Sequence, residues 1–328
     1  MHVEKQPLGF VLINDGVDNQ LQSIIHNIVN TTKDIALRVN QGALAGILGA
    51  TEQENIQGET QKNLDIIANE LLKNALLSNE QVRAIASEEE DSPVSGNPSG
   101  KYLVAFDPLD GSSNIDINGQ IGTIFTIYPA RNDVAANSEL QFHQAGTQQL
   151  CAAYVLYGAS TLLVINTGGP TRCFTLDAKS RQFLLTIPAL EIPRDTQEFS
   201  INMSNQRFWH QDFKHYIDDL ISGETGIRKK NFNMRWNAAM VGDMHRVLIR
   251  GGIFVYPSDN RNAKQPAKLR LLYEANPIAM LVEGAGGKAF SETQRILDIP
   301  PAALHQRVAV IMGSANEVDI CMDYLRNP

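Results

Sequence analysis

The spacing of apolar residues predicts two amphipathic helices within the first 80 positions of the chain. The second has its apolar stripe between Leu64 and Leu76, and Asp65 lies off this stripe, so we expect Asp65 on the exposed side. The polar stretch between the helices, residues 48–60, is bounded by glycines and is predicted to form a mobile loop. The first helix has a stripe at helical spacing that ends before Gly42: Leu21, Ile24, Ile25, Ile28, Ile35 and Val39.

From about residue 81 the pattern changes to short apolar runs rich in β-branched and aromatic residues, which is typical of strands. Such runs cover residues 82–87, 101–106, 121–129, 150–157, 161–166, 172–176 and 182–187.

Two prolines, Pro188 and Pro193, mark a predicted linker. We expect an N-terminal domain, residues 1–195, and a C-terminal domain, residues 196–328. Because strands and helices are mixed without strict alternation, the fold class is predicted to be layered α/β. In the second part, helices are predicted near 207–221, 237–249, 276–284 and 316–326, and strands over 251–257 and 268–273.

The charge balance and the cysteines narrow the classes of function. Acidic residues outnumber basic ones, 36 to 28, and the net charge of −8 argues against a nucleic-acid partner. The longest uncharged apolar run, residues 150–165, is too short for a membrane span and is interrupted at Gly158, so we expect two strands joined by a tight turn. The three cysteines show no CxxC spacing, which is typical of reduced thiols. We therefore expect a cytoplasmic protein without a membrane partner.

Acidic residues follow three of the predicted strands. Residues 88–90 are three glutamates after the strand 82–87, Asp107 and Asp110 follow the run ending at residue 106, and Glu274 follows the strand 268–273. If these strands are parallel neighbours, their carboxylates converge on one crevice and need a cation among them. An all-oxygen ligand set favours Mg²⁺ or Mn²⁺ over zinc.

The residues after Asp110 are suited to binding a phosphate. Gly111, Ser112, Ser113 and Asn114 offer backbone N–H groups and hydroxyls beside the acidic residues. A cation site beside an anion cradle is the arrangement that metal-assisted phosphoryl transfer requires.

Each signal has a simpler explanation when it is taken alone. Asp-Pro-x-Asp-Gly is a good β-turn sequence, and a run such as 87–91, SEEED, is usually a solvated charge run. In a strand over 268–273, alternation puts Lys268, Arg270 and Glu274 on one face, either a solvated face or a phosphate-binding one. It puts Leu269, Leu271 and Tyr273 on the opposite face, towards the core. The three segments together favour a metal-dependent phosphatase.

The chain resembles the class I fructose-1,6-bisphosphatases along nearly its whole length. The resemblance rests on SEEED, FDPLDGSSNID, IGTIF, GGIFVYP, KLRLLYEANP and GGKA, in the order found in that family. It implies an αβαβα sugar-phosphatase fold and a homotetramer that hydrolyses the 1-phosphate of fructose 1,6-bisphosphate. It also implies two or more Mg²⁺ ions per subunit, for which Mn²⁺ can substitute.

The resemblance also implies roles for single residues. Asp65 matches the carboxylate that activates the attacking water together with Glu88, and Glu59 stands where the family often has an aspartate on its catalytic loop. The metal ligands would be Glu88, Glu89, Asp107, Asp110, Glu274 and the carbonyl group of Leu109.

Substrate contacts follow from the same motifs. Arg270 would help Asp110, Gly111, Ser112 and Ser113 to hold the 1-phosphate. Arg235 would reach the 6-phosphate of a neighbouring subunit. The sugar and the 6-phosphate would be held by Asn202, Tyr256 and Lys268.

The chain departs from the family pattern at two places. Trp236 and Asn205 stand where phosphate contacts are expected, which leaves open a dual fructose-1,6-/sedoheptulose-1,7-bisphosphatase. Around residues 14–22 the stretch that grips the inhibitor AMP is changed, and Pro129 replaces an arginine, although Lys101 and Tyr102 match other AMP contacts. We therefore expect weak or absent AMP inhibition. A non-catalytic sugar-phosphate sensor is the alternative from another class.

Overall fold

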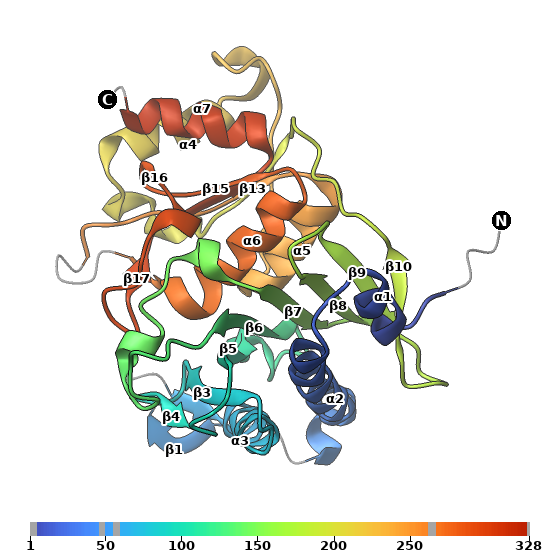
Figure 1. The fold of residues 1–328 in the computed structure, drawn as a ribbon. Helices are drawn as coiled ribbons and strands as arrows, with labels where there is room; N and C mark the ends of the chain where they lie inside the picture. Colours follow the sequence, from blue (N-terminus) through green and yellow to red (C-terminus); the bar gives the residue numbers. More distant parts are fainter. Residues whose placement is uncertain (1–4, 46–49, 55–59, 262–266, 327–328) are drawn as a thin grey trace.

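A computed structural model describes residues 5–45, 50–54, 60–261 and 267–326 of the chain. Its largest element is an eight-stranded sheet that holds all the strands predicted between residues 82 and 187, and these predictions are confirmed (Figure 1). The order across the sheet is β10-β9-β8-β7-β6-β5-β3-β4, and only β3 and β5 run parallel. The strands are β3 (Val82–Ser87), β4 (Val94–Ser95), β5 (Tyr102–Asp110), β6 (Ile121–Pro129), β7 (Cys151–Tyr157), β8 (Thr161–Asn166), β9 (Arg172–Leu176) and β10 (Phe183–Ile187).

A six-stranded sheet forms the second half of the molecule, in the order β12-β11-β13-β18-β15-β16. Only one of its strands was predicted, since the others are two to four residues long and offer little periodicity to recognise. They are β11 (Glu198–Ser200), β12 (Asn233–Met234), β13 (Ile253–Tyr256), β15 (Lys288–Ser291), β16 (Gln294–Arg295) and β18 (Val310–Gly313).

Helices cover both sheets, so that the layers follow the order αβαβα (Figure 1). The outer face of the large sheet carries α2 (Asn19–Gln41) and α3 (Asn63–Leu77). Between the sheets lie α5 (Met240–Arg250) and α6 (Asn276–Gly284), and the outer face of the small sheet carries α4 (Gln211–Ile221) and α7 (Ala315–Arg326). The layered α/β prediction is therefore confirmed. A short helix that was not predicted, α1 (Leu8–Asn14), precedes α2.

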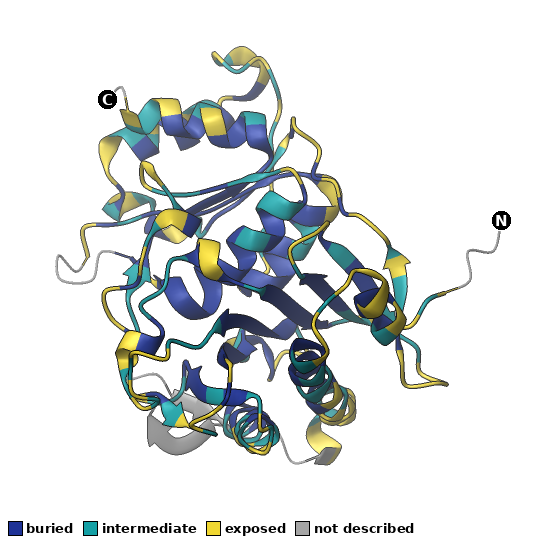
Figure 2. Cartoon of the chain, in the orientation of Figure 1, coloured by how far each residue is buried: buried dark blue, intermediate teal, exposed yellow. Residues whose placement is uncertain are grey.

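Strands that are buried on both faces explain the continuous apolar runs of the sequence. On β7, Ala153 and Val155 pack towards α2 and α3, whereas Tyr154 and Leu156 pack into the layer of α5 and α6. Figure 2 shows these central strands as buried along their length. Because neither face meets water, the usual apolar–polar alternation disappears.

Two sequence predictions about the first 80 residues are wrong. Part of the stretch 48–60 pairs as an antiparallel hairpin of β1 (Ala50–Glu54) and β2 (Thr60–Lys62) instead of forming a loop throughout. Asp65 lies in the first turn of α3 and is only 4% exposed. Asp65 is buried because other segments pack around the first turn of α3, including on the side that lies off the apolar stripe of the helix.

The strand predicted over 268–273 is also wrong. Only β14 (Leu269–Arg270) is extended, paired with β17 (Arg307–Val308), and residues 271–275 form a π-helical turn that leads into α6. Successive side chains of a helical turn do not alternate between two faces, so the alternation expected from a strand is lost. No helix within the described ranges has the length and apolarity needed to cross a membrane.

Candidate active site

One cavity of about 420 Å³ collects most of the predicted site residues. It lies where the ends of β3 and β5 meet the β14–α6 segment and the start of α5. Its walls are formed by Asp65, Glu88, Glu89, Asp107, Leu109, Asp110, Gly111, Ser112, Ser113, Asn202, Trp236, Ala238, Ala239, Met240, Phe254, Tyr256, Lys268, Leu269, Arg270 and Glu274.

Three buried carboxylates form the centre of this cavity. One oxygen each from Asp107, Asp110 and Glu274 lies within 4.8 Å of the others. Asp107 and Asp110 come from the end of β5, as expected, but Glu274 comes from the π-helical turn and not from a parallel strand. The three-strand explanation of the convergence is therefore wrong, although the residues do converge.

Backbone N–H groups orient these carboxylates. Leu109 donates to Asp107 Oδ1 over 2.9 Å, and Val241 donates to Asp110 Oδ2 over 2.7 Å. The N–H of Arg270 donates to Glu274 Oε2 over 2.7 Å, because the helical turn brings Glu274 back towards the end of β14. Each carboxylate thus keeps one oxygen occupied by the protein, which limits its rotation.

Glu88 enters the site because β3 and β5 are parallel. Its N–H donates to the carbonyl oxygen of Phe106 over 3.1 Å, which places it beside Asp107 at the same edge of the sheet. Glu88 is 8% exposed and its Oε1 lies 2.5 Å from Nη1 of Arg270. Glu89 also lines the cavity, but Glu90 does not. Of the six carboxylates at the ends of the predicted strands, five therefore line the cavity, and Glu90 is the exception.

Burial and crowding shift these groups strongly towards their protonated forms. Burial raises the pKa of Glu88 to about 8, although Arg270 opposes the shift. Burial raises the pKa of Asp110 to about 7, and that of Asp107 well above its usual range, where the neighbouring carboxylates add to the effect. Such a set of groups binds a cation in exchange for protons.

The donor chemistry fits a hard divalent cation. Asp107, Asp110 and Glu274 offer oxygen atoms only, and they are close enough for one ion to contact all three. Glu88 and Glu89 line the same cavity and provide further oxygen atoms.

The segment 111–113 continues from the carboxylates along the cavity wall. Gly111 has a φ of 77°, and a Cβ at this position would lie 2.4 Å from Cβ of Ala239. Glycine is therefore required by both the backbone conformation and the close approach. Asn114 fixes the far end of the segment, because its Nδ2 donates to the carbonyl oxygen of Asn237 over 2.9 Å.

Lys268, Tyr256 and Asn202, which the resemblance predicts to contact the sugar and the second phosphate, line the same cavity. Trp236 lies against this region, stacked on Phe254 with ring centroids 6.2 Å apart and an interplanar angle of 6°.

Two other predicted residues stand apart from the cavity. Arg235 is exposed and does not line it, and Asn205 accepts a hydrogen bond from Arg261 Nη1 over 3.1 Å. Glu59 lies outside the described residues. Leu269 lines the cavity together with Lys268 and Arg270, but it is also buried in the core between the two sheets, so its predicted core position is confirmed.

Sequence reasoning missed the contribution of the α5 N-terminus. Residues 238–240 line the cavity, and the N–H of Val241 holds Asp110. No motif announces this contact, because a backbone N–H carries no sequence signal.

Comparison with known proteins agrees with this geometry. Two family models match the chain: fructose-1,6-bisphosphatase, N-terminal domain, over residues 11–188, and fructose-1,6-bisphosphatase, C-terminal domain, over residues 192–326. A fructose-1,6-bisphosphatase class 1 from Cellvibrio japonicus is 69% identical over 98% of this chain and 99% of the relative. One from Saccharophagus degradans is 63% identical over the same shares.

Solved structures are similar over the whole chain. The holo form of fructose-1,6-bisphosphatase from Leishmania major superposes with a TM-score of 0.92 at 37% identity, covering 98% of this chain and 99% of that one. The T-state structure of the Leishmania enzyme superposes with a TM-score of 0.87, also at 37% identity, and covers 99% of each chain.

Proposed function

Since the chain belongs to the class 1 fructose-1,6-bisphosphatase family, we propose that its cavity hydrolyses the 1-phosphate of fructose 1,6-bisphosphate to give fructose 6-phosphate and inorganic phosphate. The observation that carries the proposal is the position of the Asp107–Asp110–Glu274 group next to the segment 111–113 in one cavity. Asp110 of the carboxylate group and Gly111 of the phosphate-binding segment are consecutive residues, so the two proposed sites adjoin along the chain.

Enzymes of this family are metal-dependent phosphatases, and we propose Mg²⁺, two or more ions per subunit, with Mn²⁺ as a substitute. Bound divalent ions neutralise phosphoryl oxygens and lower the pKa of an attacking water. Asp107, Asp110 and Glu274 would hold them together with Glu88, Glu89 and the carbonyl group of Leu109.

The other residues bind the substrate and move a proton. Asp65 and Glu88 both line the cavity and accept the proton of the attacking water. Arg270 and Asp110, with the N–H groups and hydroxyls of residues 111–113, hold the 1-phosphate. Glu59 belongs to the same catalytic group by family resemblance.

The distal part of the substrate meets a separate set of residues. Lys268 provides positive charge for the 6-phosphate, and Tyr256 and Asn202 provide hydrogen bonds. By family resemblance, Arg235 contacts the 6-phosphate of a neighbouring subunit in a homotetramer, and its exposed position leaves it accessible for such a contact. We also propose the domain division 1–195 and 196–328, and a cytoplasmic location, which the three buried, unpaired cysteines support.

Phosphate release tests the proposal directly. We would compare fructose 1,6-bisphosphate with sedoheptulose 1,7-bisphosphate and inositol 1-phosphate, each with Mg²⁺ and with chelator. Fast, metal-dependent release from the fructose compound is expected. Comparable release from the sedoheptulose compound would make the enzyme a dual bisphosphatase. If no compound releases phosphate and Asp65→Asn binds the sugar bisphosphate as the wild type does, the protein is a sugar-phosphate sensor and not an enzyme.

A further inference from the structure

We propose that Asn69, together with Lys73, is a positioning residue that holds the turn 87–90 in register with Asp65, and that Glu90 is an anchor of this turn instead of a metal ligand. The inference rests on the proposed function, because it concerns how the carboxylates of that site are kept in place. It assigns a role to the third glutamate of the SEEED stretch.

The turn is tied to α3 by a directional chain of hydrogen bonds. The N–H of Glu89 donates to Oγ of Ser87 over 3.2 Å, and this hydroxyl donates to Oδ1 of Asn69 over 2.7 Å. The amide of Asn69 then donates through Nδ2 to Oε1 of Glu90 over 2.9 Å. Both polar atoms of the Asn69 amide are therefore used, each by a different residue of the turn. Ser87 and Asn69 are 1% and 6% exposed, so water competes little with these bonds.

Lys73 completes the anchor and explains why Glu90 turns away from the cavity. Its ammonium lies 2.6 Å from the same Oε1 of Glu90 that Asn69 contacts. On the backbone side, a ring nitrogen of His305 lies 3.0 Å from the carbonyl oxygen of Glu90. Glu90 is thus held through its side chain and its main chain, while Glu88 and Glu89 line the cavity.

The spacing along α3 connects this anchor to the proposed proton acceptor. Asp65, Asn69 and Lys73 are four residues apart in turn, so their side chains lie on one face of the helix. Asp65 lines the cavity and Asn69 holds the turn that carries Glu88. The network therefore fixes the distance between the two carboxylates that would accept the proton of the water. Catalysis is sensitive to displacements of about 1 Å in such groups.

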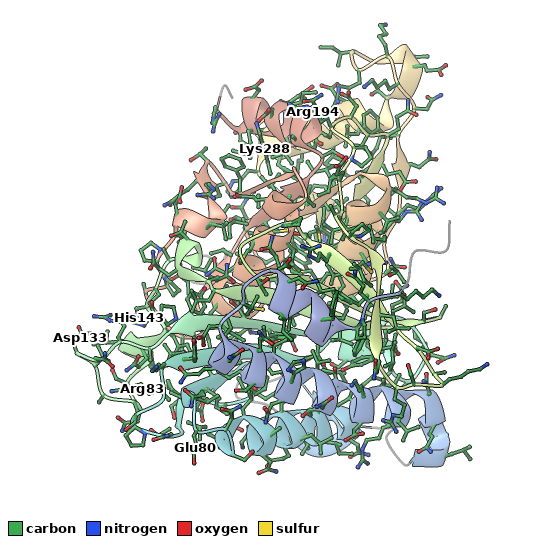
Figure 3. All side chains as sticks on the ribbon, turned by 45° about the vertical axis from the view of Figure 1, so that its right-hand side comes forward. Glu80, Arg83, Asp133, His143, Arg194 and Lys288 are labelled. Atoms are coloured by element: carbon green, nitrogen blue, oxygen red, sulfur yellow. The ribbon has the colours of Figure 1, made fainter. Side chains whose placement is uncertain are left out.

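Four variants test the network. Asn69→Asp keeps the acceptor for Ser87 but replaces the donor with a carboxylate that faces Glu90. Lys73→Met and Glu90→Ala each remove one side of the anchor, whereas Glu90→Gln keeps the accepting oxygen and removes the charge. Lys288→Met is the matched control, because the ammonium of Lys288 also lies 2.6 Å from a carboxylate, that of Asp319. Figure 3 shows Lys288 at the opposite end of the molecule from Glu80, the residue that follows α3 closely in the chain.

We would measure kcat, KM for fructose 1,6-bisphosphate, Mn²⁺ binding by calorimetry and the melting temperature. Replacing residues that orient metal ligands without touching the metal costs about 10- to 100-fold in activity or metal affinity. We expect a loss of this size in kcat or Mn²⁺ affinity for Asn69→Asp and Glu90→Ala, with little change in KM. Glu90→Gln is expected to retain most of the wild-type behaviour, and Lys288→Met all of it.

Several outcomes would overturn the inference. If Glu90→Gln weakens Mn²⁺ binding as much as Glu90→Ala does, Glu90 is a ligand and not an anchor. If Asn69→Asp and Lys73→Met leave kcat and Mn²⁺ affinity at the wild-type level, the network has no positioning role. A wild-type protein without phosphatase activity would instead contradict the proposed function, and the calorimetry would still report on the anchor.

Discussion

Nη1 of Arg270 lies 2.5 Å from Oε1 of Glu88, and both side chains are buried at the edge of the same cavity. Nη1 of Arg270 also lies 3.8 Å from Glu274. One guanidinium thus offsets the charge of two carboxylates that the proposed mechanism assigns to metal binding. The same guanidinium is assigned to the 1-phosphate. Replacing Arg270 should therefore alter the charge around both the proposed metal ligands and the proposed phosphate site.

Replacing Arg270 should affect both stability and phosphate binding. Removing one partner of a buried ion pair costs about 3–5 kcal/mol when the other charge stays buried. We expect Arg270→Met to melt at a lower temperature than the wild type at pH 9, and to need a much higher phosphate concentration for product inhibition. The melting difference should shrink at pH 6, because Glu88 is then protonated. Arg270→Lys keeps the positive charge, so its melting temperature at pH 9 should lie between those of the wild type and Arg270→Met. Equal melting temperatures of the wild type and Arg270→Met at pH 9 would contradict the assignment of the ion pair.

The stability of the metal-free protein should fall as pH rises. The pKa of Glu88 is raised from 4.5 to about 8 by burial, and that of Asp110 from 3.8 to about 7. A raised folded-state pKa contributes stability that is complete below the unfolded value and is lost as pH rises through the folded value. Melting temperatures without metal should therefore decrease between about pH 5 and 8, by the sign of these shifts.

Divalent metal should reverse this trend, because it replaces the protons that the carboxylates release. A ligand that binds only the folded protein raises its free energy of unfolding by about 2.7 kcal/mol when the free ligand concentration is one hundred times Kd. The increase in melting temperature on adding Mg²⁺ should be larger at pH 8 than at pH 6. An increase that is equal at both values would show that the buried carboxylates do not exchange protons for metal.

A methyl group at Gly111 should damage the site without unfolding the protein. Gly111→Ala places a Cβ 2.4 Å from that of Ala239, two residues before the N–H that holds Asp110. We expect kcat/KM to fall more than about tenfold, since a barrier increase of about 1.4 kcal/mol suffices for this loss. Gly168→Ala is the control: its φ of 94° gives a comparable backbone penalty, but no atom lies within 4 Å of the new Cβ. If both variants show the same activity, the contact with Ala239 is not important.

Micromolar AMP should not inhibit the enzyme through the N-terminus of α2. Oδ1 of Asp18 accepts from the N–H groups of Gln20 and Leu21 over 2.9 and 3.3 Å, and from the hydroxyl of Tyr102 over 2.9 Å. A fixed carboxylate therefore uses the donors that an incoming phosphate would need, and the hydrogen bond from Tyr102 lowers the pKa of Asp18.

Inhibition of the wild type by micromolar AMP would contradict this prediction. Asp18→Gly removes the competing carboxylate and leaves the backbone donors in place. If AMP inhibits Asp18→Gly but not the wild type, the side chain of Asp18 is the cause of the insensitivity.

Local sequence was sufficient to predict helices and strands whose hydrophobic pattern extends over more than a few residues. The stripe from Leu64 to Leu76 predicted α3, and the apolar runs between residues 82 and 187 predicted the large sheet. The resemblance to the bisphosphatase family rested on contiguous motifs such as FDPLDGSSNID, and the comparisons confirm it. In each case the information lies within one continuous segment.

Tertiary structure decided the features that depend on contacts between distant segments. Asp65 is buried because other elements cover the end of α3, which no helical stripe can reveal. Glu274 reaches Asp107 and Asp110 through a π-helical turn, and an apolar run with a charge at its end does not distinguish such a turn from a strand. Glu90 follows two proposed ligands in sequence but is drawn away by Asn69 and Lys73. The sequence by itself determined the family and the kinds of side chain at the site. Only the packing of α3, β5 and α5 against one another decided which carboxylates face the cavity, because that choice depends on partners more than 15 residues away.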